Sequence, residues 1–505
     1  MDTSKPAVTL STGAANPPSL RARSAVAAVL IITAWRILML GFNRTDLFVD
    51  EAQYWLWSQN LDFGYYSKPP MIGWVIRLFT TLGQSDASFW VRLAAPLFHM
   101  ATALLLMPIA SQTTGRDTGP WAAITFVTLP AVSLSSALMS TDTIQLTFIA
   151  AAILFFLRLT KRSSIGSAVG LGVCLGLAFL TKYSVLFLLP GVGVAMLLMP
   201  GARIAWRDAL LAGGIGAVVV APNLWWNVLH RGITIQHTES IANWSSSSGK
   251  GGLDLMSGIG FLVAQFGVVG PIVFAAMLWA LRRMATGAQR RPSEALLAWL
   301  SLPCVALLTA QAVFGGANAN WAVPAYVAGT VLATGVMMAW PWPVMRTSLV
   351  INAIPVVLIP VVSVFPMAFK LPNGDLVLKR FVGRSVISDF AGKVGEQENV
   401  RVIVAENRPI LGDLFYTLRD RGFSLHARPI SGFPRNYYEQ VFPLTAAAPS
   451  PVLYISEARL LCQGEPAEVV ARFAVPFGYR AGHIVNAYKV SPDCLLAPSA
   501  ALAQN

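Results

Sequence analysis

Charged residues are rare in this chain of 505 residues, yet several gather in the stretch LFVDEAQYWLWSQNLDFGYYSKPPMIGW, residues 47–74. Two adjacent carboxylates, Asp50 and Glu51, lie near its start, and Lys68 stands directly before two prolines. A carboxylate can orient an attacking hydroxyl group or take its proton. A lysine at the start of a helix can hold an anion together with the free backbone N–H groups there. These residue types suit catalysis on an anion that is anchored in a membrane.

Asp50 also has a structural alternative, because its position fits the N-cap of a helix. Val49 and Tyr54 would then form a hydrophobic staple, and Gln53 would complete a capping box. A cap at the membrane surface also aims its carboxylate, so this alternative does not exclude a functional role. Glu51 would point about 100° away around the helix. We therefore do not expect the two carboxylates to act as a paired acid and base.

Lys68 is expected at the N-terminus of a helix that lies along the membrane interface. A residue before proline favours an extended conformation, and proline favours the first turn of a helix. The helix dipole disfavours a lone cation at this end, whereas a bound anion would balance it. The alternative is a lysine that extends to the lipid head groups. Apolar residues then recur at spacings of three and four, which gives the helix one apolar side: Met71, Trp74, Val75, Leu78, Phe79 and Leu82.

Further polar residues are expected on the same exterior face. Asp142, in LMSTDTIQL, lies at the exterior end of a predicted span, where a charge is either functional or, with Thr141, caps the next helix. Lys182, in FLTKYS, is either an interfacial anchor or a second phosphate contact. The segment GGANANWAVPAY brings Asn320 and Trp321 to this surface.

Three more titratable residues, His230, His237 and Glu239, fall on one face of the loop PNLWWNVLHRGITIQHTESIANW. Histidines in loops are ordinary surface residues more often than metal ligands. The tight ligand spacing of a structural zinc site is not present in this sequence. The two histidines therefore remain candidates for substrate contact only.

Composition identifies the elements that must position these groups. The chain is 55% hydrophobic and 12% charged, about half the charge of an average soluble protein, and its mean hydropathy is +0.58. Apolar runs of roughly 18 residues or more can cross a hydrocarbon core. We therefore predict an α-helical polytopic membrane protein with about eleven transmembrane helices, near 24–42, 89–110, 119–138, 143–158, 165–181, 183–200, 208–228, 255–281, 294–314, 321–340 and 347–369.

Two flanking regions differ from the transmembrane domain, which is predicted to comprise residues 24–369. Residues 1–23 are rich in Ser, Ala and Pro and are expected to be a disordered cytoplasmic tail. Residues 370–505 are predicted to form a small α/β domain of unassigned role, with strands at 401–405, in PVLYIS and in HIVNAYKV, and a helix at about 409–420. Cys462 and Cys494 both fall in it, and they can pair if this part lies outside the cytoplasm.

The net charge of +13 comes mostly from short loops between apolar runs, so it indicates orientation and anionic lipids rather than nucleic acid. The basic loops belong inside, which places 43–88, 229–254 and the C-terminus on the periplasmic side of a bacterial inner membrane. These loops carry Arg116, Lys161, Arg162, Arg203, Arg207, Arg282, Arg283, Arg290, Arg291 and Arg346.

These motifs and their order resemble the bacterial branch of the dolichyl-phosphate-mannose protein mannosyltransferase superfamily, membrane glycosyltransferases of the GT-C fold. The resemblance covers roughly residues 25–330 and is carried by DEAQYW, GYYSKPP, STD, FLTKYS, PNLWWNVLH and ANWAVPAY. The lipid A aminoarabinose transferases and the lipopolysaccharide galacturonosyltransferases are the most similar groups.

The resemblance implies a polyprenyl-phosphate-linked sugar donor, an exterior active site and inversion at the anomeric carbon. Asp50 matches the family's catalytic carboxylate and Asp142 a second acidic position in the same cavity. Lys68 matches a lysine near the lipid phosphate, where it would stabilise the leaving group. Substrate contacts are expected from Glu51, Tyr66, Lys68, Lys182, His230, His237, Asn320 and Trp321.

One residue departs from the pattern of the aminoarabinose transferases. They carry glutamate directly before the lysine, where it helps hold a metal ion, and this chain has Ser67. The departure argues against a metal site of that composition and against aminoarabinose as the sugar. No cofactor is required by the residues, and dependence on a divalent metal stays open.

We therefore expect a glycosyltransferase that moves a sugar from a polyprenyl phosphate to an envelope acceptor: lipid A, lipopolysaccharide core, another glycan or a protein. A flippase for lipid-linked sugars or a solute transporter is the alternative. Transporters place charges at mid-membrane in broken helices, whereas the notable charges here lie at span ends. A third possibility is a binding or assembly protein with an inactive site, which Ser67 would support.

Overall fold

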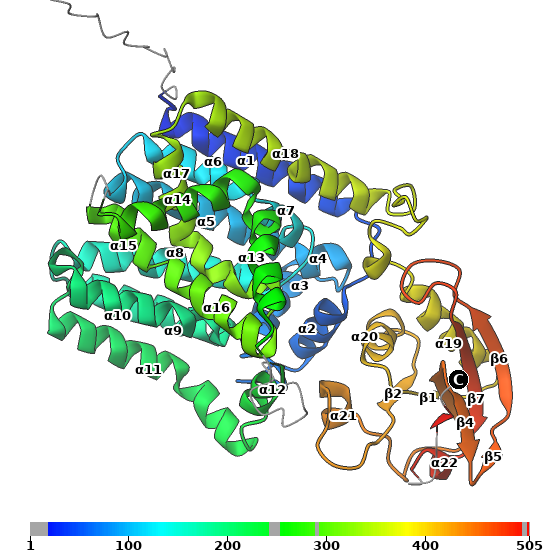
Figure 1. Ribbon diagram of the computed structural model, residues 1–505. Coiled ribbons are helices and arrows are strands. Elements are labelled where there is room, and N and C mark those ends of the chain that lie inside the picture. The colour runs from blue at the N-terminus through cyan, green and yellow to red at the C-terminus, as the bar shows by residue number, and fades with distance from the viewer. Residues whose placement is uncertain (1–18, 242–252, 288–291, 497–501, 504–505) are drawn as a thin grey trace, which may run out of the picture.

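The computed structural model describes residues 19–241, 253–287, 292–496 and 502–503. Helices dominate the described chain, and they form a bundle with a smaller region, containing a sheet, at one end (Figure 1). The predicted tail at 1–23 lies mostly outside the described residues. The helical membrane fold with a small C-terminal α/β part is thus confirmed.

Among the described residues, six helical segments are long and apolar enough to cross a membrane, judged by length and composition. They coincide with spans predicted from the apolar runs. They are α1 (Ala22–Gly41), α4 with α5 (Ser88–Arg92 and Ala94–Thr113), α8 (Thr141–Leu159), α11 (Trp206–Leu229), α15 with α16 (Pro292–Trp299 and Leu302–Gly315) and α18 (Trp342–Val364).

The other predicted spans correspond to shorter or interrupted helices. Residues 255–281, predicted as one span, form two helices because Gly270 has φ +92° and Pro271 starts the second. Gly270 also lies so close to the Asn352 side chain that no Cβ fits there. The elements are α6 (Thr118–Thr128), α7 (Pro130–Ser135), α9 (Ile165–Thr181), η1 (Tyr183–Leu188), α10 (Leu189–Leu198), η2 (Pro200–Ala202), α13 (Leu255–Val269), α14 (Pro271–Ala285), η3 (Ala319–Ala325) and α17 (Tyr326–Met337).

Two short helices, α2 (Val49–Gln59) and α3 (Met71–Gly83), follow α1 and lie between the bundle and the C-terminal region (Figure 1). The prediction that Asp50 caps α2 is wrong: Phe48 is the N-cap, and its N–H donates to Glu51 Oε2 at 2.8 Å. Pro70 is the N-cap of α3, as the Pro-Pro pair predicts. A third short helix, α12 (Ile233–Ile241), follows α11.

The C-terminal region is built on a five-stranded sheet of order β2-β1-β3-β7-β6. The β1 strand is parallel to both of its neighbours, and β7 is antiparallel to β3 and β6. The predicted strands at 401–405, PVLYIS and HIVNAYKV are β1, β3 and β7. The elements are α19 (Ser385–Gln397), β1 (Val402–Ala405), α20 (Arg408–Thr417), β2 (Ser424–Ala427), α21 (Tyr437–Val441), β3 (Val452–Ser456), β6 (Val469–Ala474) and β7 (Ile484–Val490), after the short η4 (Lys379–Phe381).

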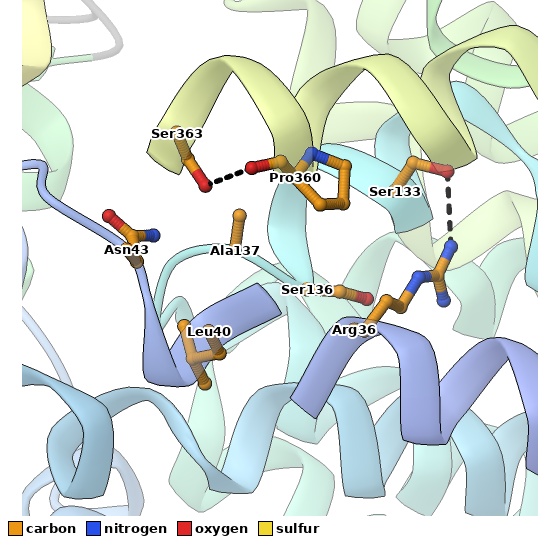
Figure 2. Close-up of a pocket in the computed structure, with 8 residues that line it drawn as sticks. All are labelled: Arg36, Leu40, Asn43, Ser133, Ser136, Ala137, Pro360 and Ser363. Atoms are coloured by element: carbon orange, nitrogen blue, oxygen red, sulfur yellow. Dashed lines mark hydrogen bonds between the residues drawn. The ribbon is translucent and has the colours of Figure 1, made fainter. Parts of the chain in front are cut away.

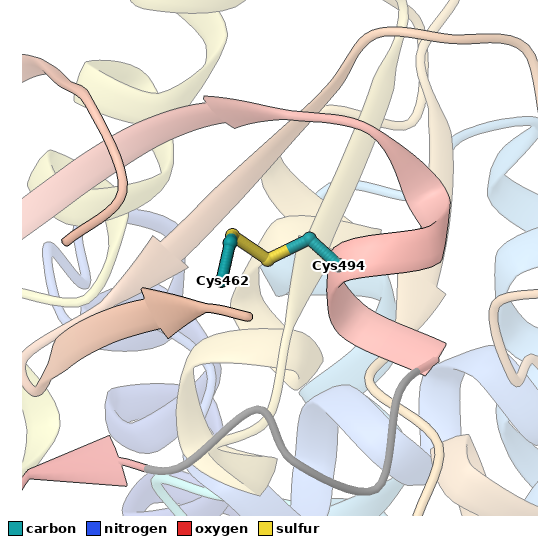
Figure 3. Close-up of a disulfide and its surroundings, with 2 residues drawn as sticks. All are labelled: Cys462 and Cys494. Carbon is teal, nitrogen blue, oxygen red and sulfur yellow. A yellow bond between two sulfur atoms is a disulfide. The ribbon is translucent and has the colours of Figure 1, made fainter. Parts of the chain in front are cut away.

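A disulfide joins Cys462 to Cys494, which confirms the pairing that the sequence left open (Figure 3). It links the end of β4 (Arg459–Cys462) to α22 (Pro492–Leu496). The β4 strand also pairs with β5 (Glu465–Pro466) and β8 (Leu502–Ala503) in a second small sheet. The disulfide therefore fixes α22 to β4 of the second small sheet.

The C-terminal region packs directly on α2. One continuous cluster of buried apolar side chains joins Trp57 and Ile72 of the loop helices to Leu411, Leu414 and Tyr438. The Tyr416 hydroxyl also donates to the carbonyl of Asp86, at 2.8 Å, across the same contact. This packing holds α20 over the start of α2, and it determines the site described below.

A small cavity of about 10 Å³ lies between α1, α7 and α18 (Figure 2). Arg36 enters it from α1 and donates to the Val127 carbonyl at 2.7 Å and to Ser133 Oγ at 3.1 Å. Such a volume holds about one water molecule. The cavity is too small for a sugar or a phosphate group, so the functional site must lie elsewhere.

Candidate active site

Asp50 lies in the first turn of α2, and its side chain is 45% exposed. Its Oδ1 accepts a hydrogen bond from Nη2 of Arg408, at 2.6 Å. Its Oδ2 has no hydrogen-bond partner among the described residues. One oxygen is therefore held by the protein, and the other is available to a substrate.

Arg408 belongs to the C-terminal region, where it starts α20 directly after β1 and its short turn. Its Nε donates to Gln53 Oε1 at 2.8 Å, and Gln53 Nε2 in turn donates to Ser67 Oγ at 3.4 Å. A chain of hydrogen bonds thus runs from Asp50 to the residue before Lys68. Sequence reasoning missed Arg408; the signal available was a basic residue at the start of the helix that follows a predicted strand.

Asp142 lies in α8 and forms side-chain contacts with a residue at the end of α9 and a residue of η3. It lies in the first turn of α8, which Ser140 caps by accepting from the Thr143 N–H at 3.4 Å, so neither Thr141 nor Asp142 is the cap. Its Oδ1 pairs with Lys182 Nζ at 2.7 Å, at the end of α9. Its Oδ2 accepts from Asn320 Nδ2 at 3.0 Å. Three predicted site residues, distant in sequence, are therefore in contact.

Lys68 is near enough to both groups of contacts for their charges to act on it. Burial and the nearby cations Lys182 and Arg408 lower the pKa of Lys68 to about 8, although Asp50 and Asp142 act in the opposite direction. Lys68 forms no ion pair with any residue that the structure describes. It is thus a cation surrounded by paired charges, and a bound anion would give it the partner it lacks.

The rings of Tyr66 and His237 contact each other near Lys68. Their ring centroids are 4.7 Å apart, and the Tyr66 hydroxyl donates to the Pro434 carbonyl at 2.9 Å. Burial lowers the pKa of His237 to about 4, and Lys68 and Arg408 contribute to this shift. The imidazole is therefore neutral at physiological pH, so it adds an uncharged polar surface to the site.

Glu51, His230 and Trp321 lie outside this group, and their geometry does not support the predicted substrate contacts. Glu51 is buried and paired with Arg92 through both oxygens, each at 2.9 Å, and it also accepts from the N–H of Met139. His230 stacks on Trp226 at 3.9 Å instead of turning toward the charges. The Trp321 side chain packs against the apolar core of the bundle.

The side chains present do not fit a metal ion at the position that the resemblance suggested. Ser67 offers one hydroxyl oxygen, which already accepts from Gln53. In the described ranges, no group of three or more His, Cys, Asp or Glu is placed to share a metal. The proposed reaction therefore uses no metal ion.

Comparison with known proteins decides the family. Residues 67–226 match the model of the dolichyl-phosphate-mannose-protein mannosyltransferase family. RgtD of Rhizobium johnstonii, a lipid A galacturonosyltransferase, is 49% identical over 474 residues, which cover 94% of this chain and 99% of that protein. The chain belongs to this superfamily. It is a membrane glycosyltransferase, as its motifs predicted.

Two further similarities agree with this assignment. RgtB of the same organism, a lipopolysaccharide core galacturonosyltransferase, is 26% identical over 58% of this chain and 62% of its own length. The crystal structure of ArnT from Cupriavidus metallidurans bound to undecaprenyl phosphate has a TM-score of 0.64 at 14% identity, and the match covers 95% of this chain and 99% of ArnT. This second similarity shows that the two proteins share the GT-C fold.

Proposed function

We propose that the protein transfers a galacturonosyl group from a polyprenyl-phosphate donor to lipid A, with inversion. Two neighbouring groups carry this proposal. Lys68 forms no ion pair with a described residue, and Asp50 has only one of its two oxygens bound, by Arg408. A phosphate and an attacking hydroxyl group need these two partners at neighbouring positions. The 49% identity to a lipid A galacturonosyltransferase supports the choice of sugar and acceptor, and the fold shared with ArnT bound to undecaprenyl phosphate supports the donor class.

The reaction is a single displacement at the anomeric carbon. The acceptor hydroxyl oxygen forms the new bond from the face opposite the phosphate, and the bond between the anomeric carbon and the phosphate oxygen breaks. The polyprenyl phosphate leaves with the electron pair, and Lys68 stabilises the charge that develops on it. Asp50 Oδ2 orients the hydroxyl group and receives its proton. Attack from the opposite face gives inversion.

Asp142 supports the site without taking part in bond exchange. Its two oxygens hold Lys182 at 2.7 Å and Asn320 at 3.0 Å. In this position Asp142 fixes the ammonium group of Lys182 and balances its charge. Asp142 therefore keeps the far side of the site in place as the donor binds.

We place the reaction on the periplasmic side of a bacterial inner membrane. The α2, α3 and α12 helices lie at the end of the bundle that carries the C-terminal region (Figure 1). Positive charges of the sequence fall in the loops that the positive-inside rule assigns to the cytoplasm. The disulfide supports an oxidising compartment for the C-terminal region.

Reconstitution of the purified protein into liposomes tests the proposal. Polyprenyl-phosphate galacturonic acid and lipid A are supplied, and mass spectrometry measures lipid A with one added hexuronic acid. We expect this product, and NMR spectroscopy of it should show the anomeric configuration opposite to that of the donor. A flippase would instead move the donor across the sealed bilayer with no new glycosidic bond, and that result would overturn the proposal.

A further inference from the structure

Arg408 comes to the site from the C-terminal region, and not all of its guanidinium N–H groups have a hydrogen-bond partner among the described residues. It lies 358 positions from Asp50 in the sequence. Two of its nitrogens are engaged, Nη2 with Asp50 at 2.6 Å and Nε with Gln53 at 2.8 Å. Its Nη1 has no hydrogen-bond partner among the described residues, and the side chain is 34% exposed. A donor group therefore remains open beside the catalytic carboxylate.

We propose that Arg408 binds the carboxylate of the donor sugar and thereby selects a hexuronic acid over the corresponding hexose. This inference rests on the proposed function. A hexuronosyl donor carries two anionic groups, the phosphate and the sugar carboxylate, whereas a hexosyl donor carries the phosphate alone. Each anionic group needs its own cationic partner when it enters a partly buried site.

Lys182, Lys68 and Arg408 differ in whether they are available to bind an anionic group of the substrate. Lys182 is balanced by Asp142 at 2.7 Å. Lys68 has no ion pair with a described residue, so it serves the phosphate. Arg408 is the remaining cation, and a guanidinium can bridge two carboxylates because its donors point outward in a planar fork. Arg408 can therefore hold Asp50 and the sugar carboxylate together.

The supporting contacts fix the direction of the guanidinium. Gln53 holds Nε from the adjacent turn of α2, and it is itself 1% exposed and linked to Ser67. Packing of α20 on α2 holds the backbone of Arg408. A site preorganised in this way rejects a substrate that lacks the matching group, because the donor would then be left without its partner.

The test compares two donors that differ only at C6, polyprenyl-phosphate galacturonic acid and polyprenyl-phosphate galactose, with lipid A as acceptor. The preference is measured as the ratio of kcat/KM, or of inhibition constants if galactose is not transferred. We expect R408Q to reduce this ratio by at least about tenfold, mostly through loss on the hexuronosyl donor. Q53A, which keeps the charge but removes its support at Nε, should reduce it by less.

Arg421 provides the matched control. It lies in the same region, where it pairs with Glu396 at 2.8 Å and with Asp389 at 3.4 Å, so R421Q removes a cation without touching the site. We expect R421Q to keep the wild-type ratio. Thermal unfolding in detergent verifies that each variant is folded. If R408Q does not fold, the donor preference of Q53A tests the inference.

The alternative anion is a phosphate of the lipid A acceptor. If Arg408 bound that phosphate, R408Q would slow transfer from both donors equally, and the loss would vanish with dephosphorylated lipid A. Either this result or an unchanged ratio in R408Q and Q53A overturns the inference. Failure of the wild-type protein to transfer any sugar would instead overturn the proposed function.

Discussion

The charged side chains of this site differ in how many hydrogen-bond and ion-pair partners they have within the protein. Asp142 has both oxygens engaged, Asp50 has one, and Lys68 has no ion pair with a described residue. The fully engaged group supports the site, whereas the partly engaged groups are the ones that can exchange a partner for a substrate. This distinction assigns the proton to Asp50 and the phosphate to Lys68 in the proposed reaction.

Titration of Lys68 should limit the reaction at alkaline pH. Burial, Lys182 and Arg408 lower its pKa to about 8, so the ammonium form that a phosphate needs is present below this pH and lost above it. We expect kcat/KM for the donor to fall above about pH 8. In K68R the guanidinium stays charged, and the alkaline fall should disappear even if activity is lower. A pH profile with the same fall in K68R would contradict this role.

Local elements of the site were predictable, whereas the contacts between distant elements were not. The Pro-Pro pair predicted the start of α3, and short apolar runs separated by Gly and Pro predicted β1, β3 and β7. Tertiary packing decided the rest: Arg92 lies 41 positions from Glu51, and Arg408 lies still farther from Asp50. A single sequence can mark Arg408 as a basic residue at a helix start, but it has no local signal that pairs residues so far apart. Glu51 was therefore predicted as a substrate contact.

The α2 helix depends on Glu51 for its attachment to the bundle. Its carboxylate accepts from the Phe48 N–H, the Met139 N–H and the Arg92 guanidinium. We expect E51Q to destabilise the protein by about 3 kcal/mol or more, because Arg92 is left as a buried charge without its counter-ion. Thermal unfolding in detergent measures this loss.

Exposed Glu239, on α12, provides the control for E51Q. We expect E239Q to keep the wild-type unfolding temperature, because it loses no buried partner. The donor KM of the folded E51Q fraction should also match the wild type. An E51Q protein of normal stability that no longer binds the donor would show instead that Glu51 contacts substrate.

The whole molecule joins a helical bundle to a C-terminal region that completes the site. The bundle supplies Asp142, Lys182 and Asn320, the loop helices supply Asp50 and the segment with Lys68, and the C-terminal region supplies Arg408. The GT-C fold and the membrane location followed from apolar runs and motif order. The contribution of the C-terminal region became visible only when its packing on α2 was known.

The disulfide should stabilise the C-terminal region without affecting the chemistry. It links positions 32 residues apart, between β4 and α22, and loss of such a link typically costs about 2–5 kcal/mol. We expect the double variant C462S/C494S to unfold at a lower temperature but to keep its transfer rate at low temperature. Cys174, an unpaired cysteine, serves as the control through C174A. Equal unfolding temperatures for the double variant and the wild type would contradict the prediction.

The transfer rate of D50N in liposomes tests the central claim most directly. The substitution keeps the size of the side chain but removes the charge that accepts the proton. We expect sugar transfer to lipid A, measured by mass spectrometry, to fall by about 100-fold or more, while thermal unfolding shows a folded protein. Transfer by folded D50N at the wild-type rate would contradict the assignment of Asp50 as the group that receives the proton.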